Sequence, residues 1–151
     1  MQELLLANGY PALFLLSFCA STLIPLGSEW LLVALLVKGF APLPVVMVAS
    51  AGNVLGACTS YLVGIYGSAF LTTTVLRIDA ADRARAGQLF NRYGSWCLLL
   101  SWLPVVGDPL CLLAGVMRIG FGRFVMLVTT GKVARYALVA WATVEGHQLL
   151  I

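Results

Sequence analysis

Charged residues are scarce in this chain. They make up 10% of its 151 residues, whereas soluble domains average nearer ~25%. Hydrophobic residues make up 61%, and the mean hydropathy is +0.98. Such a chain has too little polar surface for water, so most of its outside must face lipid. The composition therefore predicts one all-α integral membrane domain over residues 1–151.

Signatures of several other protein classes are also missing. The net charge is only +3, and the arginines cluster in stretches that flank apolar segments rather than in a nucleic-acid patch. No partner nucleic acid, cofactor or metal is therefore expected. The N-terminus carries Glu3 and no positive region before its apolar run, so a cleaved signal peptide is not expected. The cysteines lack Cys-x-x-Cys spacing and are interpreted as small core or lipid-facing residues; they are Cys19, Cys58, Cys97 and Cys111.

Two carboxylates stand out against this apolar background. Glu29 and Asp108 each lie four residues after a proline and within two residues of a glycine. An ionised side chain at membrane depth is costly and is kept where it is paired or functional. Proline and glycine beside each charge would break a helix at that depth. The residues of these two predicted breaks are Pro25, Gly27, Pro104 and Gly107.

The apolar segments fall into two long and two short stretches. Residues 45–67 and 124–144 are each long enough to cross ~30 Å of hydrocarbon as a helix. Residues 30–37 and 110–117 are about 12 Å long as helices and cannot cross alone. Apolar arms, residues 10–24 and 95–103, precede these short stretches.

Two interpretations of arm and short stretch remain open. Residues 10–37 could form one long helix kinked at Pro25, because membrane helices tolerate proline. Alternatively, each arm enters partway, turns at the break and returns as a re-entrant hairpin. Closely spaced proline and glycine favour the turn, and the hairpin would have to be buried against protein or line a wet cavity.

The segment between the halves is polar. Asp79 can cap a helix that starts at Ala80, and this helix is predicted to be short, amphipathic and laid on the membrane surface. The arginines of residues 77–95 and 118–123 place six positive charges on two loops, which the positive-inside rule makes cytoplasmic. The predicted apolar stripe consists of Ala81, Ala84, Leu89 and Phe90.

A shift of 79 residues overlays the two halves. It aligns both prolines, both carboxylates and the motif Gly52-x-Val54 with Gly131-x-Val133. Repeat 1 covers about 10–67, a linker 68–93 and repeat 2 about 94–146. Each repeat would hold one re-entrant hairpin and one transmembrane helix. An odd number of crossings makes the repeats inverted, as in transporters whose site lies at the repeat interface.

Four charges are predicted at membrane depth, namely Glu29, Asp108, Lys132 and Arg135. Insertion scales assign each ~2.5–3.5 kcal/mol, so mutual pairing is expected. Lys132 and Arg135 are three residues apart and share a helix face. Two interpretations stay open: an ion-pair cluster that only pins the helices, or a polar cavity with two proton-carrying or gating acids and two anion-binding bases.

Further polar groups favour an anion. Asn53 is the repeat partner of Lys132, and Ser28 lies at the first break. Half-helices that begin after Gly27 and Gly107 would aim their first N–H groups at the cavity, which suits phosphate.

Two motifs resemble a known family. Residues 101–108 read Ser-Trp-Leu-Pro-Val-Val-Gly-Asp, and residues 131–136 read Gly-Lys-Val-Ala-Arg-Tyr. Together with the unit at residues 25–29, they are similar to the DedA family, also called the VTT or SNARE-associated group, and to its short bacterial YqaA-like branch. Most of that family carries arginines around the second proline, where this chain has Ser101 and Gly107. Anion binding would therefore rest on Lys132 and Arg135.

The resemblance implies an inner-membrane protein that translocates phospholipids or polyprenyl-phosphate carriers, in some relatives with the proton gradient. The leading prediction is a flippase or scramblase for an anionic lipid, not an enzyme. The alternatives are a proton-coupled exporter of small solutes or cations, a polyprenyl-diphosphate phosphatase with Ser28 as nucleophile, and a scaffold. Two crossings make a thin wall, so a homodimer is a further prediction.

Overall fold

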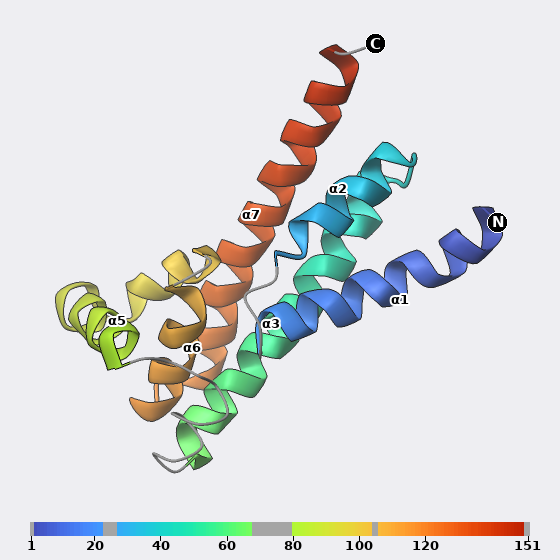
Figure 1. Ribbon diagram of the computed structural model, residues 1–151. Coiled ribbons are helices and arrows are strands. Elements are labelled where there is room, and N and C mark those ends of the chain that lie inside the picture. The colour runs from blue at the N-terminus through green and yellow to red at the C-terminus, as the bar shows by residue number, and fades with distance from the viewer. Residues whose placement is uncertain (1, 23–26, 68–79, 104–105, 150–151) are drawn as a thin grey trace.

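The computed structural model describes residues 2–22, 27–67, 80–103 and 106–149, and every regular element in these ranges is a helix (Figure 1). This confirms the predicted all-α class. In chain order the elements are α1 (Gln2–Ala20), α2 (Glu29–Val37), α3 (Pro42–Tyr66), α5 (Ala80–Tyr93), the 3-10 helix η1 (Gly94–Trp102), α6 (Gly107–Val116) and α7 (Phe121–Leu149).

Helices α3 and α7 are long and apolar enough to cross a membrane, over Pro42–Tyr66 and Phe121–Gly146. They correspond to the two predicted crossings. Both helices expose large apolar side chains, which would be unfavourable in water and is expected against lipid. These exposed residues include Leu43, Met47, Met126, Leu138 and Trp141.

The two short apolar stretches form α2 and α6, with nine and ten residues. Helix α1 ends at Ala20, and α2 then runs in the opposite sense (Figure 1). Arm and short stretch are thus two helices rather than one kinked helix. The predicted break residues Pro25 and Pro104 lie outside the described residues.

The two arms differ from the prediction in extent and in type. Helix α1 begins at Gln2 rather than near residue 10, because residues 2–7 are mostly good helix formers that continue the apolar arm. The second arm lies where residues 95–103 predicted it, but it is a 3-10 helix nine residues long. Such runs are seldom longer than 3–4 residues.

Both short helices end in the same way, at positions 79 apart. Gly39 and Arg118 take left-handed conformations, with φ of 89° and 51°. The next amide donates to the carbonyl five residues earlier, over 3.1 Å from Phe40 and 3.0 Å from Ile119. This hydrogen bond satisfies a carbonyl left free at a helix end. In each half, the long helix starts three residues after the left-handed position.

Glycines of α3 let the helices approach closely. A Cβ at Gly56 would lie 2.6 Å from the carbonyl oxygen of Phe18 in α1. A Cβ at Gly64 would lie 3.0 Å from the Cα of Gly115 in α6. Helix α3 is therefore packed between α1 and α6, and it also contacts α7.

Two clusters of buried apolar side chains form the core. One joins α3, α5, η1, α6 and the start of α7, and it contains Cys97 and Cys111. The other joins α1, α2, the start of α3 and the middle of α7, around Leu13, Leu32 and Tyr136. The polar residues of the site lie among these same helices.

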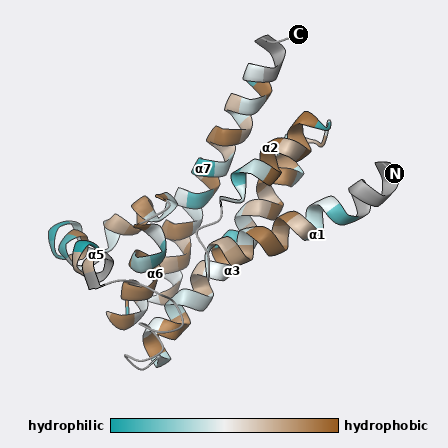
Figure 2. Ribbon diagram, in the orientation of Figure 1, coloured by the Kyte–Doolittle hydropathy of each residue, from teal (hydrophilic) through white to brown (hydrophobic). Residues whose placement is uncertain are grey.

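Helix α5 begins at Ala80, as predicted, and it contains much of the hydrophilic sequence (Figure 2). The proposed capping residue Asp79 lies outside the described part of the chain. Of the predicted apolar stripe, Phe90 is buried and Leu89 is partly buried, whereas Ala81 and Ala84 are exposed. Only the C-terminal part of the stripe packs against the protein, beside η1 and α6.

Candidate functional site

The predicted charges of the first break and of α7 form an ion pair. Nη2 of Arg135 contacts Oε1 of Glu29, and the two side chains are about a quarter exposed. Glu29 is the first residue of α2, where the helix dipole favours a negative charge. Nη1 of Arg135 donates to the backbone carbonyl of Trp102 over 2.5 Å. Arg135 therefore ties α7 to the start of α2 and to the end of η1.

The second acid and the second base are joined through a serine. Lys132 is 3% exposed, and its Nζ donates to Oγ of Ser21 over 3.0 Å and to Oδ1 of Asn53. The Ser21 hydroxyl donates to Oδ1 of Asp108 over 3.2 Å. A buried charge requires such partners. The hydroxyl of Ser21 thus bridges a buried ammonium and a carboxylate at the start of α6.

Asn53 links this group to a tyrosine. Its Nδ2 donates to the Tyr136 hydroxyl over 3.0 Å and to the Ser17 carbonyl over 3.2 Å. The Tyr136 hydroxyl and Oγ of Ser28 lie 2.6 Å apart. Ser28 is 1% exposed, so its hydroxyl is buried against Tyr136. A continuous chain of hydrogen bonds therefore runs from Ser28 through Asn53 and Lys132 to Asp108.

The structure brings together all of the predicted polar site residues in two groups. One group surrounds Arg135 and the other surrounds Lys132, on neighbouring turns of α7. Of the predicted glycines, Gly27 is exposed beside Glu29, and Gly107 is buried with its backbone against the Ser101 carbonyl. The sequence reasoning missed Ser21 and Tyr136 as site residues. Tyr136 lies four residues after Lys132, on the same helix face, and this spacing was a usable signal.

Three buried hydroxyl groups have no hydrogen-bond partner within the described part of the chain, those of Ser17, Ser50 and Ser101. Buried polar groups are nearly always satisfied, and exceptions often mark a site for water or another ligand. The interior between these helices thus has unused hydrogen-bonding capacity.

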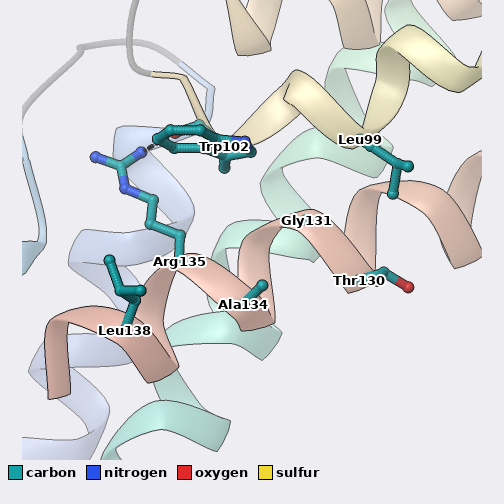
Figure 3. Close-up of a pocket in the computed structure, with 7 residues that line it drawn as sticks. All are labelled: Leu99, Trp102, Thr130, Gly131, Ala134, Arg135 and Leu138. Atoms are coloured by element: carbon teal, nitrogen blue, oxygen red, sulfur yellow. Dashed lines mark hydrogen bonds between the residues drawn. The ribbon is translucent and has the colours of Figure 1, made fainter. Parts of the chain in front are cut away.

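A groove of about 370 Å³ opens between η1 and α7. Figure 3 shows Arg135 extending from α7 toward Trp102 at one side of this groove. Apart from Arg135 and Thr130, the lining side chains are apolar or absent. The groove is lined by Leu99, Trp102, Thr130, Gly131, Ala134, Arg135 and Leu138.

Comparison with known proteins adds the family. The model of the VTT domain matches residues 24–144, which include all of the predicted site residues. The chain belongs to the VTT-domain family. This confirms the resemblance found in the sequence motifs, and it confirms the membrane class.

Named relatives of this VTT-domain protein match over most of their length. The protein named inner membrane protein YqaA from Escherichia coli K12 is 43% identical over 136 residues, covering 89% of this chain and 91% of that protein. The Shigella flexneri protein of the same name matches to the same extent. An uncharacterized Haemophilus influenzae protein is 35% identical over 138 residues, covering 86% and 84%. No solved structure matches.

Proposed function

We propose that this VTT-domain protein moves lipids with anionic head groups between the leaflets of the bacterial inner membrane. The location follows from its relative in Escherichia coli, which is named inner membrane protein YqaA. The observation that carries the proposal is the buried polar network, which joins α1, α2, α3, α6 and α7 in a chain otherwise built for lipid. Buried polar groups at membrane depth are expensive and are typically found on substrate or ion pathways.

The proposed architecture consists of two inverted repeats, in which α1–α2 and η1–α6 are re-entrant hairpins and α3 and α7 cross the membrane. The matching ends of α2 and α6 at Gly39 and Arg118 support it. The contact between Lys132 and Asn53, 79 residues apart, supports it as well. Residues related by a two-fold axis can contact one another only near that axis. The site would then lie at the repeat interface, as in many transporters.

The proposed roles follow from charge. Arg135, at the groove, would bind the phosphate of the lipid, because guanidinium groups match phosphate in geometry and charge. Lys132 would supply a second cation, which is joined to Asp108 through Ser21. Glu29 and Asp108 would serve as gating or proton-coupling acids. The loops at residues 77–95 and 118–123 would face the cytoplasm.

Reconstitution in liposomes tests the proposal. Leaflet exchange of fluorescent polyprenyl phosphate and of phosphatidylethanolamine would be followed for wild type, Glu29→Gln and Arg135→Ala. Exchange by the wild-type protein and its loss in both variants is the expected result. Full exchange in both variants, or no exchange by folded wild-type protein, would contradict the assignment.

The same preparation separates the alternatives. An exporter of small cations would give substrate-driven proton flux without lipid movement. A phosphatase would release phosphate from a lipid diphosphate and lose that activity in Ser28→Ala. The burial of Ser28 against Tyr136 favours a transporter over this enzyme. The number of subunits in active vesicles would test the predicted homodimer.

A further inference from the structure

The groove between η1 and α7 leads to Arg135, whose guanidinium group is already paired with a carboxylate. Arg135 lines the groove, and the carboxylate of Glu29 holds its Nη2. An incoming anion would therefore compete with Glu29 for the guanidinium group. The partial exposure of the pair, about a quarter for each side chain, makes this competition possible without unfolding.

We propose that, when no substrate is bound, the Glu29 carboxylate occupies the position on Arg135 that the substrate's phosphate takes. The phosphate of a lipid, entering laterally through the groove between η1 and α7, displaces the Glu29 carboxylate from Arg135. This inference rests on the proposed function and names the order of events at its site. The exchange is one of ionic partners, and no covalent bond forms or breaks.

The guanidinium group is fixed in a way that suits such an exchange. Its Nη1 is held by the carbonyl of Trp102 at the end of η1, so Arg135 keeps its position when Nη2 changes partner. Arginine has five donors in a planar fork and can bind phosphate through two of them. Release of Glu29 would remove the ion pair between α7 and the first residue of α2. Binding of the phosphate would thereby be coupled to the contact between these two helices.

The groove offers apolar surface beside Arg135. Its volume of about 370 Å³ lies at the low end of the ~300–1,000 Å³ typical of ligand sites. Gly131 and Ala134 leave α7 without bulky side chains there, and Leu99 and Leu138 supply apolar surface. Hydrocarbon of a lipid can therefore lie beside Arg135 while its phosphate reaches the guanidinium group.

Ser101 offers a second, independent indication of a ligand. Its side chain is 4% exposed, and its hydroxyl has no partner among the described residues. A Cβ placed on Gly131, which lines the groove, would lie 3.5 Å from this hydroxyl oxygen. The hydroxyl group is thus an unused donor close behind the groove, beside the arm that also provides the Trp102 carbonyl.

If Glu29 competes with the phosphate, removal of its charge should strengthen binding rather than weaken it. A binding assay on the full chain in detergent micelles can test this prediction. Farnesyl monophosphate serves as the probe. Glu29→Gln should bind it about tenfold more tightly than wild type, because a charge-assisted competitor is removed. Arg135→Ala should lose binding. Glu145→Gln, a change of an exposed acid on α7, is the matched control and should leave the affinity unchanged.

Unchanged or weaker binding in folded Glu29→Gln would overturn the proposal. Inorganic phosphate and farnesol, which carry the head group alone and the chain alone, should each bind at least tenfold more weakly than farnesyl monophosphate. Equal binding of either one would contradict the combined site.

A second variant guards against misfolding of Glu29→Gln. Ala134→Trp fills the groove and keeps both residues of the ion pair, and it should weaken the binding of farnesyl monophosphate but not that of inorganic phosphate. Binding in micelles requires no leaflet exchange. If the variants bind as expected but the wild-type protein does not exchange lipid in liposomes, the proposed function alone is contradicted. If the wild-type protein exchanges lipid but Glu29→Gln does not bind farnesyl monophosphate more tightly, this inference alone is contradicted.

Discussion

At the scale of single residues, Lys132 is the critical group for stability. Among the charged side chains whose burial the structure describes, it is the only buried one, and it neutralises Asp108 through Ser21. Lys132→Met keeps the approximate shape but leaves Asp108 without a buried counter-charge. We expect a loss of ~3–5 kcal/mol, seen as a lower melting temperature of the purified protein in micelles.

A double-mutant cycle tests the cause of that loss. If uncompensated charge is responsible, Lys132→Met with Asp108→Asn should be more stable than Lys132→Met alone, because the two sites are coupled. Additive losses in the double mutant would show that the serine-bridged pair does not determine the stability of this region.

The hydroxyl of Tyr136 provides a second test at this scale. Tyr136→Phe removes the group that joins Ser28 to Asn53, and it leaves both without this partner in a buried place. The expected cost is about 1–3 kcal/mol, measured by thermal unfolding in micelles. Tyr66→Phe is the matched control, because Tyr66 is 83% exposed. Equal melting temperatures of the two variants would contradict the importance of the network.

At the scale of elements, contact between α1 and α3 depends on glycine. A Cβ at Gly56 would lie 2.6 Å from the Phe18 carbonyl oxygen and 2.8 Å from Cβ of Ser21, so Gly56→Ala must push α1 away. We expect a loss of ~1–3 kcal/mol, typical of overpacking, together with weaker leaflet exchange because Ser21 moves.

The control lies in α7, where a Cβ at Gly146 would meet nothing within 4 Å. Gly146→Ala should be neutral or stabilising by up to about 1 kcal/mol, because alanine favours helix more than glycine does. A loss of stability in Gly146→Ala as large as that in Gly56→Ala would show that helix packing is not the cause.

The elements differ in how well the sequence predicts them. Length and hydropathy were enough to predict α3 and α7, because a crossing must be long and apolar. Breaks at proline and glycine located the starts of α2 and α6 within two residues. The 3-10 form of η1 was not predictable, because its residues carry no pattern that separates 3-10 from α-helical hydrogen bonding.

The residues of the site also differ in how well the sequence predicts them. Charges in apolar sequence are rare, so Glu29, Asp108, Lys132 and Arg135 could be identified directly. Serine and tyrosine are common in membrane helices, and their partners depend on which helices meet. Ser21 therefore became recognisable as a bridge only once α1, α6 and α7 were placed around it.

At the scale of the whole molecule, orientation in the membrane is the first prediction. All four cysteines are free, so a cysteine-free background can carry single new cysteines. Gln88→Cys in α5 should be labelled by a membrane-impermeant maleimide only after the cells are broken. Lys38→Cys, after α2, should be labelled in intact cells, because the positive-inside rule puts the arginine-rich loops in the cytoplasm. The reverse pattern would contradict the predicted orientation.

The last prediction concerns what the ion pair does for the molecule. Exchanging the charges, with Glu29→Arg and Arg135→Glu together, restores an attractive contact between α2 and α7 but removes the cation from the groove. If the pair only pins the hairpin, this double variant should regain both the stability and the leaflet exchange that each single variant loses. If Arg135 receives the phosphate, the melting temperature should recover toward the wild-type value while exchange stays at the background of empty vesicles. Exchange at the wild-type rate in the charge-swapped protein would assign the pair a purely structural role, since a carboxylate on α7 repels a phosphate rather than binding it.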